Sequence, residues 1–240
     1  MQAVKIKLYQ NMVNYRREMS FGYVQSYPLP TPSMIRGMAH ALLDLKEYKP
    51  LKISIQGNFS TVVTNMQKII KFDRDPKSRP ANPYHVTVGN SQKTATTGVM
   101  FVDSIVDMEL LLHIAFEEEN LNQKLLEALI LKPVVLGRNE DFANLDFRYL
   151  KIVDIETSDE YKDLDYNIYL NTAFCKKEQL SGTSYRLPFY YQAISSFEDK
   201  RIFQFTDAVY IAKGSSISEH EYLIDEDNDL VSFLEASGEK

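Results

Sequence analysis

The sequence has one cysteine, four histidines and no long apolar run, and each scarcity excludes a class of protein. Cys175 alone can form neither an internal disulfide nor a zinc site. Because no run of about 18 apolar residues is present, no transmembrane helix is expected. The first residues carry charges within their apolar stretch, unlike a secretory signal peptide. We therefore expect a cytoplasmic protein without a membrane partner.

Catalytic and cofactor motifs are equally scarce. The chain contains no GxGxxG, no phosphate-loop lysine motif, no GxSxG and no HExxH. Its histidines are scattered without metal-ligand spacing, and His113 lies in a strongly apolar stretch typical of a core histidine. We therefore expect a non-enzymatic protein with no cofactor, no metal and no catalytic residues.

The acidic residues Asp225, Asp227 and Asp229 superficially suggest a calcium loop. Such a loop needs glycine at its sixth position and glutamate at its twelfth, where this chain has Leu230 and Ala236. We therefore interpret this segment as a solvated acidic tail.

Charge is divided unevenly along the 240 residues. Residues 1–100 hold 14 Lys and Arg against 5 Asp and Glu, whereas residues 101–240 hold 13 against 28, and the balances of +9 and −15 give the net charge of −6. Such a division suggests one surface for a polyanion and another for a protein neighbour, unless folding mixes the charges.

Hydrophobic periodicity indicates an α+β fold. Residues 3–9 alternate as a half-buried strand, and Pro32 opens a helix whose Ile35, Met38 and Leu42 share one face. The following segments are a strand at 51–55, a strand at 99–116, a leucine-rich helix ended by Pro133 and a strand at 147–155. This order is the βαββαβ pattern of a ferredoxin-like (RRM-type) domain over residues 1–155. Residues 71–98 form a basic insertion between strands two and three, and residues 156–240 form an acidic, mostly β extension with short strands that include 166–174.

The helix after Pro32 carries the first group of candidate RNA-binding residues. Its second face holds Ser33, Arg36, Gly37 and His40. The N–H groups of the first helical turn have no partners within the helix, Arg36 lies beside them, and Gly37 has no side chain. A phosphate can therefore approach closely. The simpler interpretation is an ordinary amphipathic helix with a polar outer face.

Further candidates are basic or aromatic. The turn Gly137, Arg138 and Asn139 can hold phosphate, although Arg138 can instead pair with Glu140 or Asp141. Tyr27 can stack on a base, and Arg16 and Arg17 are weaker candidates. The insertion contributes Lys71, Arg74, Lys77, Arg79 and Lys93, which are otherwise solvated loop residues.

Three segments resemble the Cas-five family of CRISPR-associated proteins, in its type I-B-like branch. They are YPLPTPSMIRGMAHAL, PLKISIQGNFS and VVLGRNEDFANLD, and the resemblance covers residues 3–155. It implies a RAMP-superfamily subunit of the Cascade ribonucleoprotein complex, which acts in antiviral defence and caps the 5′ handle of the guide RNA (crRNA). It also implies that residues 71–98 form a thumb that bends RNA and contacts the backbone subunit, and that the large subunit and the target DNA lie nearby.

Two other hypotheses remain open. One family branch cleaves repeat RNA with a Tyr, Lys and His set, but His113 follows Leu112 and not a lysine. A metal-independent endonuclease processing pre-crRNA would have to use residues such as His40, Tyr27 and Lys52. The third hypothesis is a protein-interaction module that binds no RNA.

Overall fold

An antiparallel sheet forms the centre of the fold. The computed structural model describes residues 1–20, 22–74, 85–194, 197–218 and 220–235. β1 (Gln2–Val13) pairs with β6 (Ser91–Phe116) on one side and β9 (Lys151–Ser158) on the other, and β6 also pairs with β3 (Leu51–Asn58). The central strand order is therefore β3-β6-β1-β9 with all neighbours antiparallel, in a strand-rich α+β protein.

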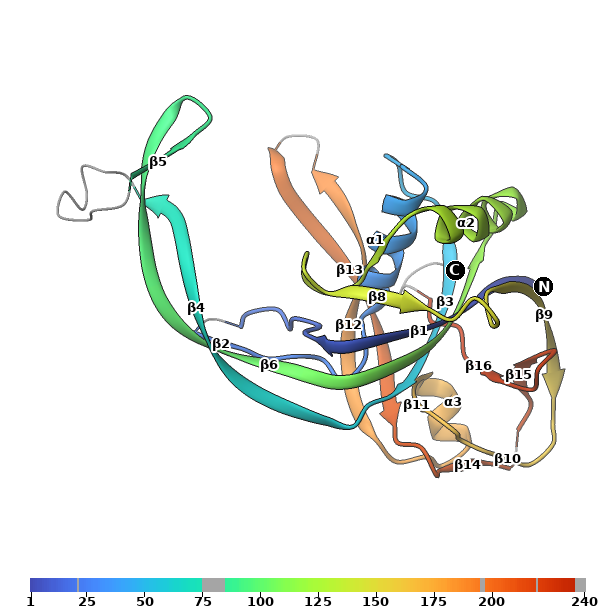
Figure 1. The fold of residues 1–240 in the computed structure, drawn as a ribbon. Helices are drawn as coiled ribbons and strands as arrows, with labels where there is room; N and C mark the ends of the chain where they lie inside the picture. Colours follow the sequence, from blue (N-terminus) through green and yellow to red (C-terminus); the bar gives the residue numbers. More distant parts are fainter. Residues whose placement is uncertain (21, 75–84, 195–196, 219, 236–240) are drawn as a thin grey trace.

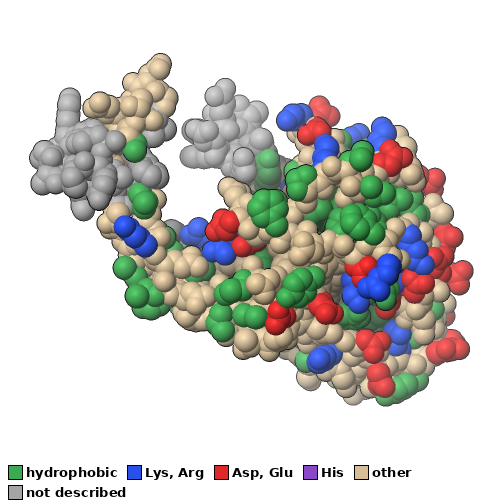
Figure 2. Space-filling view, in the orientation of Figure 1, with side chains coloured by type: hydrophobic (Ala, Val, Ile, Leu, Met, Phe, Trp, Pro, Cys, Tyr) green, Lys and Arg blue, Asp and Glu red, His purple; other side chains and the backbone are tan. Residues whose placement is uncertain are grey.

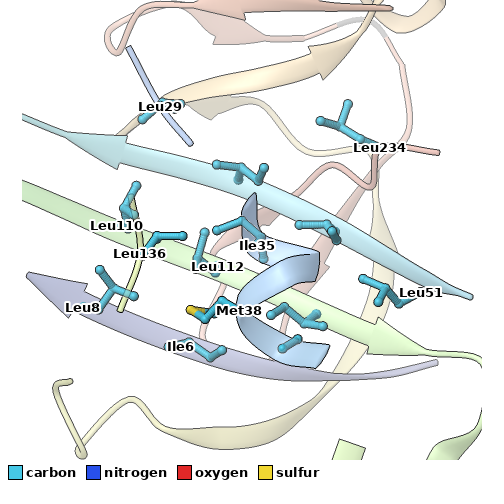
Figure 3. Close-up of a cluster of buried hydrophobic side chains, with 14 of the residues drawn as sticks. Ile6, Leu8, Leu29, Ile35, Met38, Leu51, Leu110, Leu112, Leu136 and Leu234 are labelled. Atoms are coloured by element: carbon cyan, nitrogen blue, oxygen red, sulfur yellow. The ribbon is translucent and has the colours of Figure 1, made fainter. Parts of the chain in front are cut away.

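Helices α1 (Pro32–Leu42) and α2 (Glu119–Leu131) cover one face of this sheet (Figure 1). The alternation predicted for residues 3–9 is confirmed, because Val4, Ile6 and Leu8 enter the main hydrophobic core. Figure 3 shows Ile35 and Met38 of α1 lying over the strands that carry these side chains. Among the described residues, no helix has both the length and the apolarity needed to cross a bilayer.

A long, curved arm leaves the body (Figure 1). It consists of β4 (Thr61–Arg74), β5 (His85–Val88) and the first part of β6, with β2 (Tyr23–Val24) beside it. The β4–β6 pairing begins at Thr61 and Val106, so the arm starts about ten residues before the predicted insertion 71–98. Polar composition marked 71–98 as an insertion, but it did not reveal that β4 and β6 project from the body well before this range.

Asp107 lies where β6 passes from the arm into the body. Its φ of +53° is uncommon for a non-glycine residue, although aspartate tolerates the left-handed region. Its carboxylate accepts hydrogen bonds from the Tyr9 hydroxyl at 2.6 Å and the Ser60 hydroxyl at 3.1 Å. These bonds tie the base of the arm to β1 and to the β3–β4 junction.

The C-terminal half extends the same sheet at both edges. β11 (Asn167–Asn171) joins β3, followed by β13 (Phe197–Ile211) and β12 (Thr183–Ile194), while β15 (Tyr222–Asp225) and β16 (Leu230–Val231) lie beyond β9. The prediction of one strand over 166–174 is wrong at its end: Asn171 accepts from the Ala173 amide at 2.8 Å and caps α3 (Thr172–Lys177). The remaining strands are β7 (Val134–Val135), β8 (Phe142–Leu145), β10 (Lys162–Asp163) and β14 (Ser216–Ile217).

The interpretation of residues 225–229 as a solvated tail is wrong. Asp225 is 2% exposed, and its carboxylate lies 2.7 Å from the Lys5 ammonium and 2.9 Å from Nε2 of the buried His113. Asp227 and Asp229 also reach the same ammonium, at 2.7 and 2.6 Å. The three carboxylates thus gather around Lys5, which fastens the C-terminal segment to the sheet face opposite the helices. Burial alone would raise the pKa of Asp225, but hydrogen bonds from His113 and Lys5 hold it well below its usual value.

Replacing Lys5 tests this fastening. Lys5→Met should lower the free energy of unfolding by about 3–5 kcal/mol, because it leaves the buried Asp225 carboxylate short of its main partner. Urea unfolding measures this change. Lys124→Met, on the exposed face of α2, should change it by less than about 0.5 kcal/mol.

The pH dependence gives a second check. A carboxylate with a depressed folded pKa stabilises the protein above its unfolded pKa of about 4, and this contribution is lost as the pH falls. The wild-type chain should therefore lose stability on acidification more steeply than Lys5→Met. Parallel curves for the two chains would contradict the assignment.

Candidate nucleic-acid interface

A cavity of about 840 Å³ lies between α1, the loop that leads to β3, and β12. Of the residues predicted on α1, it brings together Arg36, Gly37 and His40. The remaining lining residues are Ala41, Leu45, Lys46, Glu47, Tyr48, Tyr190 and Tyr191. In Figure 1 the β12–β13 hairpin stands beside α1.

Arg36 is the charged centre of this cavity. The residue is 7% exposed, and its guanidinium carbon lies 5.4 Å from the ring centre of Tyr48, 6.0 Å from that of Tyr190 and 5.7 Å from that of Tyr191. Burial lowers the pKa of Arg36 while the tyrosines oppose that change. Its Nε atom is buried without a hydrogen-bond partner, and no carboxylate within the described part of the chain forms a salt bridge with it. Among the described residues, the guanidinium therefore has an unused Nε donor and no ion-pair partner.

His40 lies one helical turn further along. Its ring stacks on Phe116 at 6.3 Å between centres, and its Nε2 atom is buried without a partner. Burial, and then the charge of Arg36, lower the pKa of His40, so the ring is neutral near pH 7. Nothing lies within 4 Å of a Cβ built on Gly37, so this glycine opens the cavity beside Arg36.

Ser33 does not reach the cavity. Its hydroxyl lies 3.0 Å from the hydroxyl of Thr31, which occupies the helix N-cap position without making a side-chain cap. Pro32 begins the helix as predicted, whereas the residues that line the cavity lie about one helical turn further along α1.

Arg138 is paired within its own loop. Its Nε and guanidinium nitrogens donate to Asp141 at 3.1 and 2.9 Å, and its backbone amide donates to the same carboxylate. Gly137 has a φ of +112°, and a Cβ there would lie 2.8 Å from the Asp141 carboxylate. Arg138 also reaches Gln67 of the arm at 3.4 Å, whereas Asn139 is exposed. The pair between Arg138 and Asp141 is the one that the alternative interpretation expected, and the contact with Gln67 links this turn to the arm.

The other predicted residues lie elsewhere. Tyr27 is 4% exposed and donates to Glu18, with Arg17 5.3 Å from its ring, so it presents no open stacking face. Arg16 is exposed and donates to the Ser20 carbonyl. Lys93 is half-buried in β6, and Lys71 and Arg74 belong to β4, whereas Lys77 and Arg79 lie outside the described residues.

Sequence analysis did not identify the three tyrosines that line the cavity, Tyr48, Tyr190 and Tyr191. Tyr48 follows α1 in a short loop, but Tyr190 and Tyr191 are distant in sequence and reach α1 only because β12 joins the sheet through β13 and β11. The adjacent aromatic pair Tyr190–Tyr191 was the one available signal; both rings reach Arg36 next to a register irregularity of β12.

Comparison with known proteins identifies the family of the chain. The family described as CRISPR-associated protein (Cas_Cas5) matches residues 3–197, so the chain belongs to the Cas-five family of CRISPR antiviral defence. No curated protein sequence matches the chain.

Comparison with solved structures finds three matches, of which the first shows a similar fold. A chain of a CRISPR RNA-guided surveillance complex is 15% identical with a TM-score of 0.57, covering 96% of this chain and 94% of its own. A chain of a Type III-B Cmr-beta complex bound to cognate target RNA and AMPPnP is 14% identical with a TM-score of 0.46 and coverages of 90% and 86%. A CRISPR protein from Archaeoglobus fulgidus is 10% identical with a TM-score of 0.45 and coverages of 98%.

An inorganic anion tests the uncompensated charge of Arg36. Millimolar pyrophosphate should raise the melting temperature of the wild-type chain, because a ligand that binds only the folded state stabilises it by mass action. Arg36→Gln should lose this increase, whereas Lys124→Gln should keep it. An equal shift in all three chains would show that the anion does not bind at Arg36.

Proposed function

We propose that this protein is a non-enzymatic subunit of a CRISPR RNA-guided complex and holds the 5′ handle of the guide RNA. Family membership supports the complex, and the Arg36 cavity carries the proposal for RNA. A buried guanidinium with a free donor calls for an anion, and a phosphate satisfies both its charge and its hydrogen bond.

The tyrosines select nucleic acid over a bare phosphate. Tyr48 and Tyr190 stack on each other at 4.6 Å, and Tyr191 is 38% exposed at the cavity. An unstacked base next to a bound phosphate can lie against such a ring, and this arrangement is typical of single-stranded RNA recognition. The neutral His40 adds one hydrogen bond without repelling the guanidinium further.

The sheet order supports the finer fold assignment. Reading β1, β3, β6 and β9 as strands one to four gives the order 2-3-1-4, with α1 and α2 in the two crossovers, as a ferredoxin-like domain requires. We assign the arm as the thumb that contacts the backbone subunit and bends the RNA, and the acidic body as the side that meets the large subunit near target DNA. In Figure 2 the acidic side chains gather on the body rather than on the arm.

RNA that copurifies with the tagged chain from its host tests this proposal, after its 5′ ends are mapped. Repeat-derived guides with one shared 5′ handle are expected. Arg36→Gln should reduce recovery of these guides roughly 10- to 100-fold, because a hydrogen bond to a charged group contributes about 1.5–3 kcal/mol. Gly37→Leu should act similarly by filling the cavity, although leucine suits a helix better than glycine.

Melting temperatures provide the folding control, with Lys124→Gln as the matched surface variant. Random RNA, or full guide recovery in both cavity variants, would contradict the proposal. Assembly that ignores salt and needs no RNA would instead favour the protein-interaction hypothesis, because phosphate contacts weaken steeply with salt.

A second candidate function is metal-independent cleavage of repeat RNA. One observation favours it: His40, neutral and with a free Nε2, lies 6.5 Å from Tyr48 between ring centres, in the same cavity as Arg36. A neutral imidazole can take the proton from a 2′-hydroxyl as its oxygen bonds to the adjacent phosphorus, and a guanidinium can stabilise the resulting phosphorane. The P–O5′ bond then breaks, the imidazolium returns the proton to the leaving 5′ oxygen, and a 2′,3′-cyclic phosphate remains. The earlier candidates Tyr27 and Lys52 do not line this cavity, and Lys52 pairs with Glu235.

Incubation of the full chain with repeat RNA in EDTA separates the two functions. The capping proposal predicts intact RNA. Cleavage at one position that disappears in His40→Ala, while Arg36→Gln still folds, would establish the nuclease instead.

A further inference from the structure

The arm has an unpaired strand edge. Within the described part of the chain, β4 pairs only with β6, whose other side pairs with β1 and β2. The pairing is continuous from Thr61 to Lys71, and the 14 residues of β4 include neither proline nor glycine. Short strands, prolines, bulges and charges normally protect an edge from pairing with another chain, but Lys68 is the single charged residue between Thr61 and Ile70. The outer edge of β4 can therefore accept a further strand.

The outer face of the arm is apolar beside this edge. Val62, Met66 and Ile70 share one face of β4 and are all exposed, Met66 at 69%. The β6 residue in register with Met66 is Phe101, which is exposed as well. Gln67 belongs to the opposite face of β4 and contacts Arg138 of the body, so the apolar face is the one turned away from the body. Figure 2 shows hydrophobic side chains on the outer side of the arm.

The residues of this edge are arranged almost symmetrically about Met66. Moving outward from Met66, both directions give an amide, then a hydrophilic side chain, then two β-branched aliphatic side chains. The matching pairs are Asn65 with Gln67, Thr64 with Lys68, Val63 with Ile69, and Val62 with Ile70. When two copies of a strand pair antiparallel about a two-fold axis, residues equally far before and after the axis face each other. An axis at Met66 therefore places side chains of similar character opposite one another at every position.

We propose that two copies of this chain pair through their antiparallel β4 edges, with the two-fold axis at Met66. One sheet then runs through both arms in the order β6-β4-β4-β6. On its outer face the two Met66 side chains lie between the two Phe101 rings, and Val62 of each copy lies opposite Ile70 of the other. This pairing covers the exposed edge in the free chain. It goes beyond the proposed function and requires no RNA.

Charge complementarity supports the same register. Asp103 of β6 accepts hydrogen bonds from the hydroxyls of Thr64 at 2.7 Å and Tyr23 at 2.6 Å, but neither Asp103 nor Lys68 forms a salt bridge among the described residues. In the dimer, Lys68 of one copy faces Thr64 of the other, two strand spacings or about 9.6 Å from the backbone of Asp103. The long lysine side chain can reach that carboxylate. A shift by one residue would instead place Val63 opposite Lys68 and join the outer face of one arm to the inner face of the other.

Sedimentation velocity on the full chain, freed of RNA, tests the proposal. A contact between two strand edges is small, so we expect a weak dimer whose fraction rises between about 1 and 100 µM protein. Met66→Lys should weaken this dimer about 10-fold or more, because it places two ammonium groups opposite each other at the axis. The matched control is Leu131→Lys, which adds the same charge at an exposed apolar residue at the end of α2 and should leave the dimer unchanged.

Cysteine cross-linking tests the register. Met66→Cys should form a covalent dimer with a short bis-maleimide, because its two copies face each other across the axis. Lys68→Cys alone should not, since its two copies are four residues out of register, about 13 Å along the strand. The double variant Thr64→Cys/Lys68→Cys should cross-link again, because these positions face each other between copies. The native Cys175 is buried and does not compete.

A wild-type chain that remains monomeric at about 100 µM would overturn the proposal, as would equal dimerisation of Met66→Lys and its control. Val99→Lys adds charge to the same outer face, one strand away from the edge. If it weakens the dimer as much as Met66→Lys does, the arms pack face to face and edge pairing is wrong. Melting temperatures check that each variant folds. Arg36→Gln should leave dimerisation unchanged, so this proposal and the proposal for RNA can fail separately.

Discussion

One strand, β6, constrains the whole molecule because it belongs to the arm and to the body at once. Its arm half pairs with β4 and β5, and its body half pairs with β1 and β3 in one continuous register. The arm is therefore an extension of the central sheet and not a separate loop. Asp107 lies at the transition, where bonds from Tyr9 and Ser60 hold it. The direction of the arm is set by backbone pairing rather than by the composition of its tip.

Two buried cations show how differently the fold compensates charge. Lys5 is surrounded by three carboxylates within 2.7 Å, so it needs nothing from outside the chain. Arg36 is surrounded by tyrosine rings, whose attraction for a cation is weaker than that of a carboxylate, and its Nε remains unused. The first arrangement is complete within the chain, whereas the second leaves the Nε donor of Arg36 without a partner among the described residues. Burial alone would not distinguish the two; the chemistry of the neighbours does.

The features that could be predicted from the sequence are those that a local residue pattern determines. The alternation of residues 3–9 and the helix after Pro32 follow from period and from proline, and both are confirmed. Asp225 was assigned to solvent because its partner Lys5 lies at the other end of the chain, and no local rule pairs them. Tyr190 and Tyr191 were missed for the same reason. The sequence offered Glu140 and Asp141 as partners of Arg138, and the three-dimensional structure shows that Arg138 pairs with both.

The acidic segment 225–229 covers Lys5 but not Lys7 on the sheet face opposite the helices. Lys5 of β1 lies in register with His113 of β6, and the next register pair on this face is Lys7 with Leu111. The segment ends there, so its Asp227 and Asp229 line the cavity at Lys7. Asp227 is already bound by Lys5 and Lys151, and Glu109 and Asp146 line the neighbouring cavity, so this end of the face carries charges of both signs. The same ion pairs that fasten the C-terminal segment thus determine which part of the sheet face stays open.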